Sequence, residues 1–297
     1  MILTYLLVAH TFGLLAAVFS RSLPWLAKSC AVLLAGMPFL ASAPLPARLY
    51  CAFGALLIGA RLSEILDCPN LSFGQRIWHV HSIYDTRQIR RSDPQLSSHL
   101  FLGAVFYGGL AIAGIWLGLR WAPSLSDGWR TLGRWGGGLV FLYGTIDAAD
   151  HFLQGIHRAL GLIVPPAQNR PILSLTLSEF WSERWNRAVS SWLRDHVFRP
   201  TVRVRFRLTP RQRLQLGLAA TFIVSGLLHG YLAAVGLEPQ LVVLAILFFP
   251  VQGLLIAVEQ RLRISRCRPA IARTWTLGLM LLTAPLLLEP VMQLLSR

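Results

Sequence analysis

The stretch that decides the fold runs from Pro171 to Gly230, and the apolar segment at its end continues to Gly236. It contains SLTLSEFWSERWNRAVSSWLRDHVF at residues 174–198, a run of arginines, and ATFIVSGLLHGYLAAVG at residues 220–236. The first segment is aromatic and basic, as in helices that lie at a membrane interface. The second belongs to an apolar run long enough to cross a bilayer, which takes about 20 residues. The stretch therefore indicates a membrane protein.

The composition of the whole chain agrees with this interpretation. Of the 297 residues, 54% are hydrophobic and 14% are charged, whereas a soluble domain has about 25% charged residues. The mean hydropathy is +0.53. We therefore predict an all-α fold, a polytopic membrane helical bundle that forms a single integral membrane domain over residues 1–297.

Eight segments are apolar enough to be predicted as membrane spans. The first has no basic leader and no clear cleavage site, so we interpret it as a span and not as a signal peptide. The two longest connections are expected to hold interfacial or re-entrant helices. The domain then consists of N-terminal helices (1–155), an insertion (156–213) and C-terminal helices (214–297). The spans are expected at residues 2–20, 26–43, 47–66, 97–119, 133–155, 214–235, 239–260 and 272–294.

The charge distribution predicts how the helices are oriented. The net charge is +15, from 28 Lys and Arg against 13 Asp and Glu. Most arginines fall in the odd-numbered connections between spans, which the positive-inside rule places in the cytoplasm, with both termini outside. We expect an integral protein of the bacterial inner membrane. Its arginines are expected to attract anionic headgroups of membrane lipids and not nucleic acid.

Several other classes of site lack their residue patterns. The four cysteines show no CxxC spacing, so neither a disulfide framework nor a metal site is predicted. A membrane di-iron centre needs several histidines at helical spacing, whereas His79–Val80–His81 is the one close pair in the sequence. The sequence has no GxSxG elbow and no phosphate-binding glycine loop. A membrane transporter stays as the non-enzyme alternative, although related halves are not visible.

Residues 174–200 carry the signals of one helix. Thr176 is a candidate N-cap, Glu179 completes a capping box, and Pro200 marks the predicted end. Asn186 lies inside this helix, where it either satisfies a backbone group or contacts a substrate. The arginines beside it fit lipid-headgroup anchors as well as a phosphate-binding site. Spacing predicts that one face carries Trp181, Trp185, Ala188 and Trp192.

His229 is the second candidate, because an imidazole in the hydrocarbon region usually faces the bundle interior or a cavity. A neutral histidine there fits a general base, and it equally fits a hydrogen bond to a neighbouring helix. Ser225 lies one turn earlier, and Gly226 and Gly230 either leave room beside the ring or serve close helix packing.

The predicted fifth span carries a polar stripe. Asp147, His151, Gln154 and Arg158 follow helical spacing, and Asp150 adjoins them. Such a stripe must face the bundle interior or lie at the end of the span. It fits a structural hydrogen-bond network and also the wall of a substrate chamber.

Three segments together resemble a known family. SLTLSEFWSERWNRAVSSWLRDHVFRPTVR, LAATFIVSGLLHG and FFPVQGLLIAVEQRL occur in this order between residues 174 and 262. The wax-synthase branch of the membrane-bound O-acyltransferases is similar, with SLxxFWxxRWNxxVSxxLRxxVYxPV before ATFxVSGxxH and a later span ending in AVE. The resemblance covers roughly residues 165–262. It implies a multi-helix bundle around an intramembrane chamber in which an acyl group passes from acyl-CoA to a hydroxyl acceptor.

The resemblance also implies roles for the candidate residues. It assigns catalysis to His229 as general base and to Asn186 as a positioning or stabilising group. Acyl-CoA is a co-substrate, no cofactor or metal is expected, and the acceptor is expected to be a lipidic partner such as a long-chain fatty alcohol. The expected substrate-binding residues are Trp181, Trp185, Arg187, Ser225, Asp150 and His151, and the expected acyl-CoA-binding residues are Arg184 and Arg194.

The sequence departs from the family pattern at two positions. Many relatives have His-Glu where this chain has His229-Gly230, and the later span often carries His-Gly where this chain has Gln252-Gly253. These differences leave the acceptor open between a fatty alcohol and a sterol, glyceride or secondary-metabolite hydroxyl, acetyl transfer included.

Overall fold

The computed structural model describes residues 2–40, 42–68, 70–204 and 207–297, and of residues 2–6 only the backbone. Helices account for most of these residues, which confirms the predicted all-α class. One short pairing is added, in which β1 (Arg90–Arg91) runs antiparallel to β2 (Leu162–Ile163). The chain divides into two compact units, one of residues up to 89 with 231–236, the other of residues 90–230 with 237–297.

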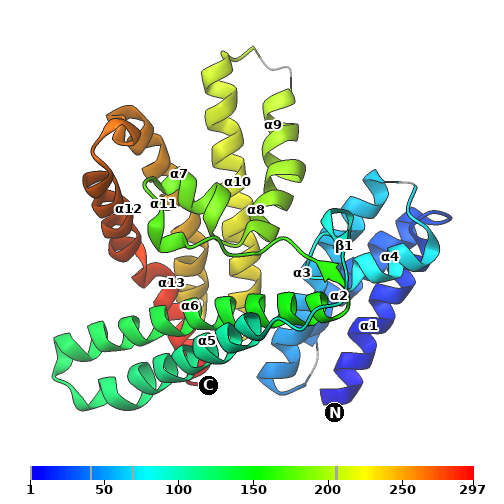
Figure 1. The fold of residues 1–297 in the computed structure, drawn as a ribbon, viewed down its shortest axis with the longest axis horizontal. Coiled ribbons are helices and arrows are strands. Elements are labelled where there is room, and N and C mark those ends of the chain that lie inside the picture. Colours follow the sequence, from blue (N-terminus) through cyan, green and yellow to red (C-terminus); the bar gives the residue numbers. More distant parts are fainter. Residues whose placement is uncertain (1, 41, 69, 205–206) are drawn as a thin grey trace. The chain divides into compact units, whose positions relative to one another are not determined.

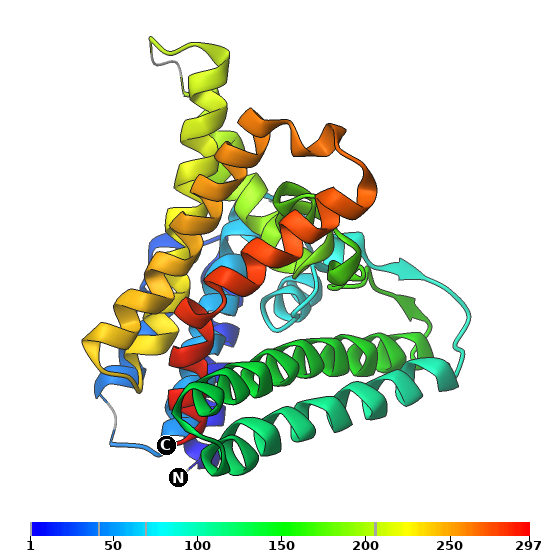
Figure 2. The ribbon, with the colours of Figure 1, turned by 90° about the vertical axis from the view of Figure 1, so that its left-hand side faces the viewer.

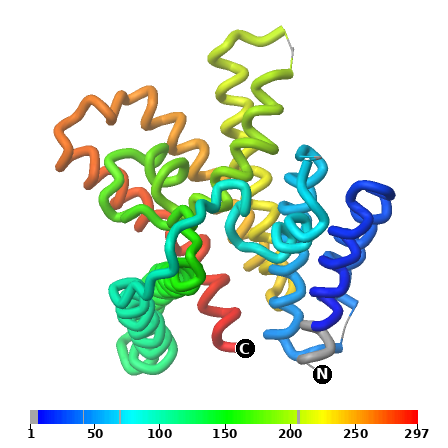
Figure 3. The backbone as a smooth tube through the Cα atoms, turned by 45° about the vertical axis from the view of Figure 1, so that its right-hand side comes forward, coloured from blue at the N-terminus to red at the C-terminus, as the bar shows by residue number. Residues whose placement is uncertain are grey.

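The first unit is built from α1 (Ile2–Phe19), α2 (Pro24–Leu40), α3 (Leu45–Asp67) and α4 (Phe73–Val80). The first three helices run beside one another (Figure 3). Small side chains dominate their contact, so that the helix backbones approach closely. The buried core contains Ala9, Ala16, Ala17, Ala27, Cys30, Leu34, Cys51, Ala55, Ile58, Leu62, Ile65 and Val80.

The second unit begins with a long helical hairpin of α5 (Ser98–Trp116) and α6 (Asp127–Ala159), which lie side by side in Figures 1 and 2. Glycines set the close approach of these helices. A Cβ on Gly114 would lie 2.4 Å from the Phe141 nitrogen, and one on Gly137 would lie 2.4 Å from the Gly118 nitrogen. Any larger residue would force the two backbones apart.

The C-terminal helices are α10 (Pro210–Ala234), of which residues 210–230 belong to this unit, α11 (Pro239–Leu262), α12 (Pro269–Thr283) and α13 (Pro285–Leu295). α12 and α13 meet at a bend of 48°. α13 packs against α11 and α6, and Trp135 Nε1 of α6 donates a hydrogen bond to Glu289 Oε2 at 3.0 Å. The core of this part is made by Leu177, Phe222, Phe248, Phe249 and Ile256.

Fewer helices have the length and apolarity of membrane spans than the sequence predicts. Among the described residues there are four, Leu45–Asp67, Ser98–Ser124, Pro210–Ala234 and Pro239–Leu262, or five if α12 and α13 form one bent span. Leu7–Phe19 and Pro24–Leu40 are shorter apolar helices. The expected span 133–155 lies within α6, which does not meet the same criterion. The total of eight spans therefore stays a prediction.

Candidate active site

The segment around Asn186 is broken and does not form the single helix predicted for residues 174–200. It consists of α7 (Leu177–Glu179), a π-helical turn (Phe180–Arg184), α8 (Arg187–Leu193), a second π-helical turn (Arg194–Phe198) and α9 (Arg199–Arg203). Trp185 is extended, and Asn186 is left-handed with φ 41° and ψ 59°. Pro200 lies in the first turn of α9, where proline is tolerated, and does not end a helix. The break also separates Trp192 from the face predicted for Trp181 and Trp185.

Two backbone hydrogen bonds and one to a side chain join a neighbouring loop to this break and hold it in place. They join residues 167–169 to residues 184–187, so that a left-handed residue is fixed from both sides. Asparagine adopts this conformation more readily than other non-glycine residues. The bonds are Asn169 N–H to Arg184 O at 2.8 Å, Arg187 N–H to Ala167 O at 2.8 Å, and Asn186 N–H to Gln168 Oε1 at 3.4 Å.

Asp150 anchors the same loop. Its carboxylate accepts hydrogen bonds from the Ala167 N–H at 3.0 Å and the Gln168 N–H at 3.1 Å, and its side chain is buried. Asp150 thus positions Asn186 through the loop and lies outside the cavity described below. Its place favours a structural contribution over the predicted substrate contact.

The start of α7 is capped as the sequence predicts. Thr176 Oγ1 accepts the Glu179 N–H at 3.0 Å. The Glu179 carboxylate accepts the Leu175 N–H at 2.7 Å and an Arg184 N–H at 2.6 Å. Burial alone raises the pKa of this carboxyl, but these hydrogen bonds hold it below its ordinary value. The Arg184 guanidinium therefore forms an ion pair with Glu179.

One face of α11 holds the α7 segment and its tryptophan. The buried Glu259 carboxylate accepts the Leu177 N–H at 2.7 Å and the Ser178 N–H at 3.4 Å. About two helical turns earlier, Gln252 Oε1 accepts the Trp181 indole N–H at 3.3 Å. The Gln252 amide nitrogen donates to Thr283 Oγ1 at 2.6 Å, so both ends of this buried amide are satisfied.

The His229 ring has one defined tautomer. Nδ1 lies 2.8 Å from the Ser225 carbonyl oxygen, and because a carbonyl only accepts, Nδ1 carries the proton. Nε2 then presents its lone pair, and no described residue donates a hydrogen bond to it. The Phe249 ring lies 4.1 Å away between centroids, at 31°, and restricts how the imidazole can turn.

The glycines near His229 serve helix packing. A Cβ on Gly226 would lie 2.5 Å from the Ile246 carbonyl oxygen, and one on Gly230 would lie 2.3 Å from the Ile246 side chain. These residues therefore set the contact between α10 and α11, and the alternative of room beside the imidazole is not supported. Their close contact fixes the helix on which His229 stands.

Asn186 and His229 line the same cavity, which has a volume of about 400 Å³. Of the other predicted site residues, Trp181, Trp185, Ser225 and Arg194 also line it. The rest of the wall is made by Ser178, Ser182, Val189, Ser190, Leu193, Phe198, Arg211, Leu214, Gln215, Leu218, Thr221, Phe222, Phe249, Ile256 and Gln260.

Four predicted site residues lie outside this cavity. Arg184 pairs with Glu179 at 2.6 Å, and Arg187 donates to the Pro166 carbonyl at 3.3 Å. His151 donates from Nδ1 to the Asp147 carbonyl at 2.8 Å, and its ring lies beside Tyr107. With Asp150, these side chains support the segments around the site. Arg158 of the same stripe donates to Ser92 Oγ and Gln95 Oε1 at 2.9 Å, and these contacts favour the structural alternative for the stripe.

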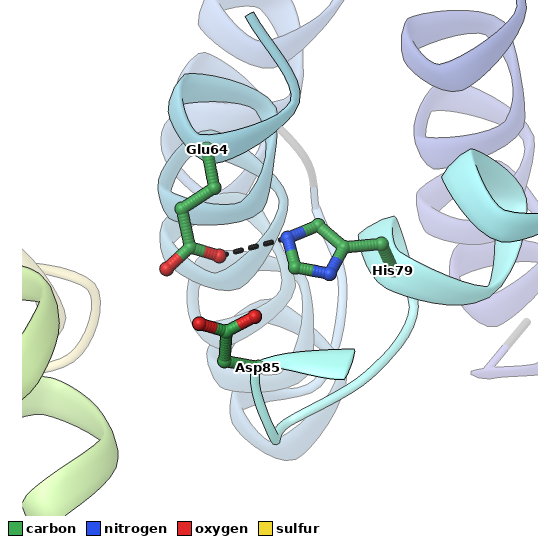
Figure 4. A group of neighbouring side chains, drawn as sticks. All are labelled: Glu64, His79 and Asp85. Atoms are coloured by element: carbon green, nitrogen blue, oxygen red, sulfur yellow. Dashed lines mark hydrogen bonds and ion pairs between the residues drawn. The ribbon is translucent and has the colours of Figure 1, made fainter. Parts of the chain in front are cut away.

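A group of side chains in the first unit was missed. Glu64, His79 and Asp85 bring potential ligand atoms within 4.8 Å of one another (Figure 4). The residues would suit a metal, but guanidinium groups already occupy the carboxylates. Arg61 lies 2.6 Å from Glu64, and Arg87 lies 2.8 Å from Asp85. The pair Arg61 and Glu64 inside an apolar helix was the available signal for this buried ionic network.

Known proteins resemble this chain over the segment that carries Asn186 and His229. Residues 164–251, which contain Asn186 and His229, match the model of the membrane bound O-acyl transferase family. Over this segment the chain is similar to that family. The match covers less than a third of the chain and includes the cavity-lining parts of the α7–α10 region.

Three of the relatives that match part of this chain are from Arabidopsis thaliana. A probable long-chain-alcohol O-fatty-acyltransferase 1 is 44% identical over 71 residues, 24% of this chain and 21% of the relative. A probable long-chain-alcohol O-fatty-acyltransferase 9 is 32% identical over 143 residues, which are 45% of this chain and 41% of the relative. An acyl-CoA–sterol O-acyltransferase 1 is 37% identical over 68 residues, which are 23% of this chain and 20% of the relative. The aligned region thus spans less than half the length of each of these relatives.

Proposed function

We propose that this protein is a membrane-embedded O-acyltransferase that moves an acyl group from acyl-CoA to the hydroxyl group of a long-chain alcohol. The observation that carries the proposal is the shared cavity of Asn186 and His229, in which His229 Nε2 is available as a base. The relatives named for acyl transfer to long-chain alcohols support the reaction class.

The chemistry requires few groups from the protein. His229 Nε2 takes the proton of the acceptor hydroxyl while its oxygen attacks the thioester carbonyl. A C–O bond forms, the C–S bond breaks, and the proton passes from the imidazolium to the departing thiolate. The products are an ester and free CoA. The Ser225 carbonyl keeps the proton on Nδ1 and so directs Nε2 toward the reaction.

Asn186 is proposed to stabilise the tetrahedral intermediate. Its Oδ1 accepts the Val189 N–H at 3.4 Å as the cap of α8. The amide NH₂ group then has donors left for an oxyanion or for the thioester carbonyl. Because Asn186 is held from residues 167–169, this donor is positioned before the substrate arrives.

The wall between these groups favours an apolar acceptor. Phe222, Phe249, Leu218 and Ile256 contribute apolar surface to it, which suits an alkyl chain. A sterol, a glyceride or another hydroxyl compound is the second candidate, and the similarity to a sterol acyltransferase is what favours testing it. No cofactor is proposed besides acyl-CoA, and the arginine-rich connections are proposed to face the cytoplasm.

Turnover with defined substrates tests the proposal. Purified protein in lipid nanodiscs is incubated with labelled acyl-CoA and a panel of long-chain alcohols, sterols and glycerides. We expect ester and free CoA in equal amounts, and a loss of at least about 100-fold in turnover for His229→Gln, which keeps a similar volume but has no base. No ester with any acceptor, or full activity of His229→Gln, would contradict it. Substrate flux into vesicles without CoA release would indicate a transporter.

A further inference from the structure

Two arginines enter the cavity from different elements. Arg194 begins the second π-helical turn, and Arg211 lies in the first turn of α10. The sequence had placed Arg194 in a site for the acyl donor but paired it with Arg184, which the ion pair with Glu179 removes from the cavity. In the structure Arg211, and not Arg184, is the second arginine that lines the cavity with Arg194.

The charge of the cavity wall is not balanced. Among the described residues that line it, Arg194 and Arg211 carry formal charges and no aspartate or glutamate is present. Asp195 lies 3.9 Å from Arg194 and 2.8 Å from Arg199, so it pairs mainly with Arg199. The N-terminal end of α10 adds positive potential beside Arg211. This part of the cavity therefore favours an anion.

The distance from this anion-binding subsite to the His229 base is set by α10. Arg211 and His229 are 18 residues apart on one helix, which corresponds to about 27 Å of rise. The side chains between them recur every three or four positions and form a continuous wall. They are Leu214, Gln215, Leu218, Thr221, Phe222 and Ser225.

We propose that Arg194 and Arg211 bind the phosphate groups of the acyl-CoA donor, with its thioester arm extended along this face of α10 toward His229. The inference rests on the proposed function. An acyl-CoA has the matching layout, with phosphates at one end of a long flexible arm and the reactive thioester at the other. Guanidinium groups bind phosphate through paired, charge-assisted hydrogen bonds.

Binding of CoA itself tests the subsite without turnover. In nanodiscs of phosphatidylcholine, Arg211→Gln and Arg194→Gln are each expected to weaken CoA binding about tenfold by calorimetry. Binding of pantetheine, which lacks the phosphates, is expected to stay within twofold of wild type. Arg203→Gln is the matched control, because Arg203 is exposed at the end of α9 and lies outside the cavity. It is expected to bind CoA as the wild type does.

The outcomes separate the subsite from its alternatives. Wild-type CoA affinity in Arg211→Gln, or an equal loss of CoA and pantetheine binding, overturns the proposal. In nanodiscs doped with phosphatidic acid, a loss of lipid binding in Arg211→Gln with unchanged CoA binding assigns the arginines to a lipid headgroup and also overturns it. Arginine-dependent CoA binding without ester formation supports the subsite and contradicts the acyl transfer.

Discussion

At the scale of single residues, Asn186 combines a backbone task with a chemical one. Its left-handed conformation ends the first π-helical turn, and its Oδ1 caps α8. The same position brings the amide into the wall of the cavity that His229 shares. Two substitutions can separate these tasks, because both tolerate the left-handed backbone and both remove the side-chain amide donor.

Asn186→Asp keeps the capping acceptor and tolerance of the left-handed conformation but removes the NH₂ donor. We expect Asn186→Asp to unfold at the same temperature as the wild type, because a carboxylate is favourable at the start of a helix. We expect turnover to fall by about 10²–10³-fold, as when an oxyanion donor is lost. Initial rates of ester formation measure this. Asn186→Gly, which also accepts the backbone conformation, should be as inactive. Wild-type turnover in either variant contradicts the role of the amide.

At the scale of elements, α11 positions the site through Phe249, Gln252 and Glu259. These residues contact the His229 ring, the Trp181 indole and the start of α7, respectively. Spacings of three and seven residues put them along one side of the helix. The element is thus a frame for groups supplied by other segments.

Glu259→Ala leaves the Leu177 and Ser178 N–H groups without their acceptor. We expect unfolding free energy to fall by about 2–4 kcal/mol, because unpaired buried donors cost about 1–3 kcal/mol each. Glu259→Gln retains one amide oxygen and should lose less than half as much. Denaturant unfolding in detergent measures both variants. Equal stability of Glu259→Ala and wild type would show that the α7 start does not depend on this carboxylate.

The ionic network of the first unit gives a pH-dependent prediction. Burial alone raises the pKa of Asp85, but hydrogen bonds and charge from Arg87 and a Gln88 hydrogen bond lower it from 3.8 to about 2. The folded state therefore gains stability from Asp85 above pH 4, and this gain is lost as the pH falls toward 2. We expect Asp85→Asn to be less stable by about 2 kcal/mol at pH 7 and equal to the wild type near pH 2. Unfolding curves of both proteins between pH 2 and pH 7 measure this. A stability difference that does not change with pH would contradict the prediction.

Local signals and distant contacts explain what the sequence could predict. Thr176 was recognisable as a cap because its partner is three residues away. His229 was recognisable because an imidazole is costly in an apolar run. The break at Asn186 depends on bonds from residues 167–169 and on Asp150, which no local pattern reveals. The partners of Gln252 and Glu259 lie 71 and 82 residues away in the sequence. Arg211 was identified as a candidate site residue only because it lines the cavity.

At the scale of the whole molecule, the sidedness of the helices decides how acyl-CoA reaches the site. The arginine-rich end of the cavity, at Arg194 and Arg211, must face the compartment that holds the donor. Residues 261–273, which include the end of α11, the connection and the start of α12, carry five arginines, and the positive-inside rule predicts that this connection is cytoplasmic. The same connection contains the exposed Cys267, which provides a reporter at a natural position.

We expect Cys267 to react with a membrane-impermeant maleimide in inverted bacterial membrane vesicles and not in intact spheroplasts. The variant used would keep Cys267 and carry alanine at Cys30, Cys51 and Cys68. A second variant that keeps only Cys51 is the matched control, since that thiol is buried and should react in neither preparation until the protein is unfolded. Labelling of Cys267 in spheroplasts would reverse the predicted orientation. The arginine subsite would then face away from cytoplasmic acyl-CoA, so this single measurement bears on the topology and on the donor together.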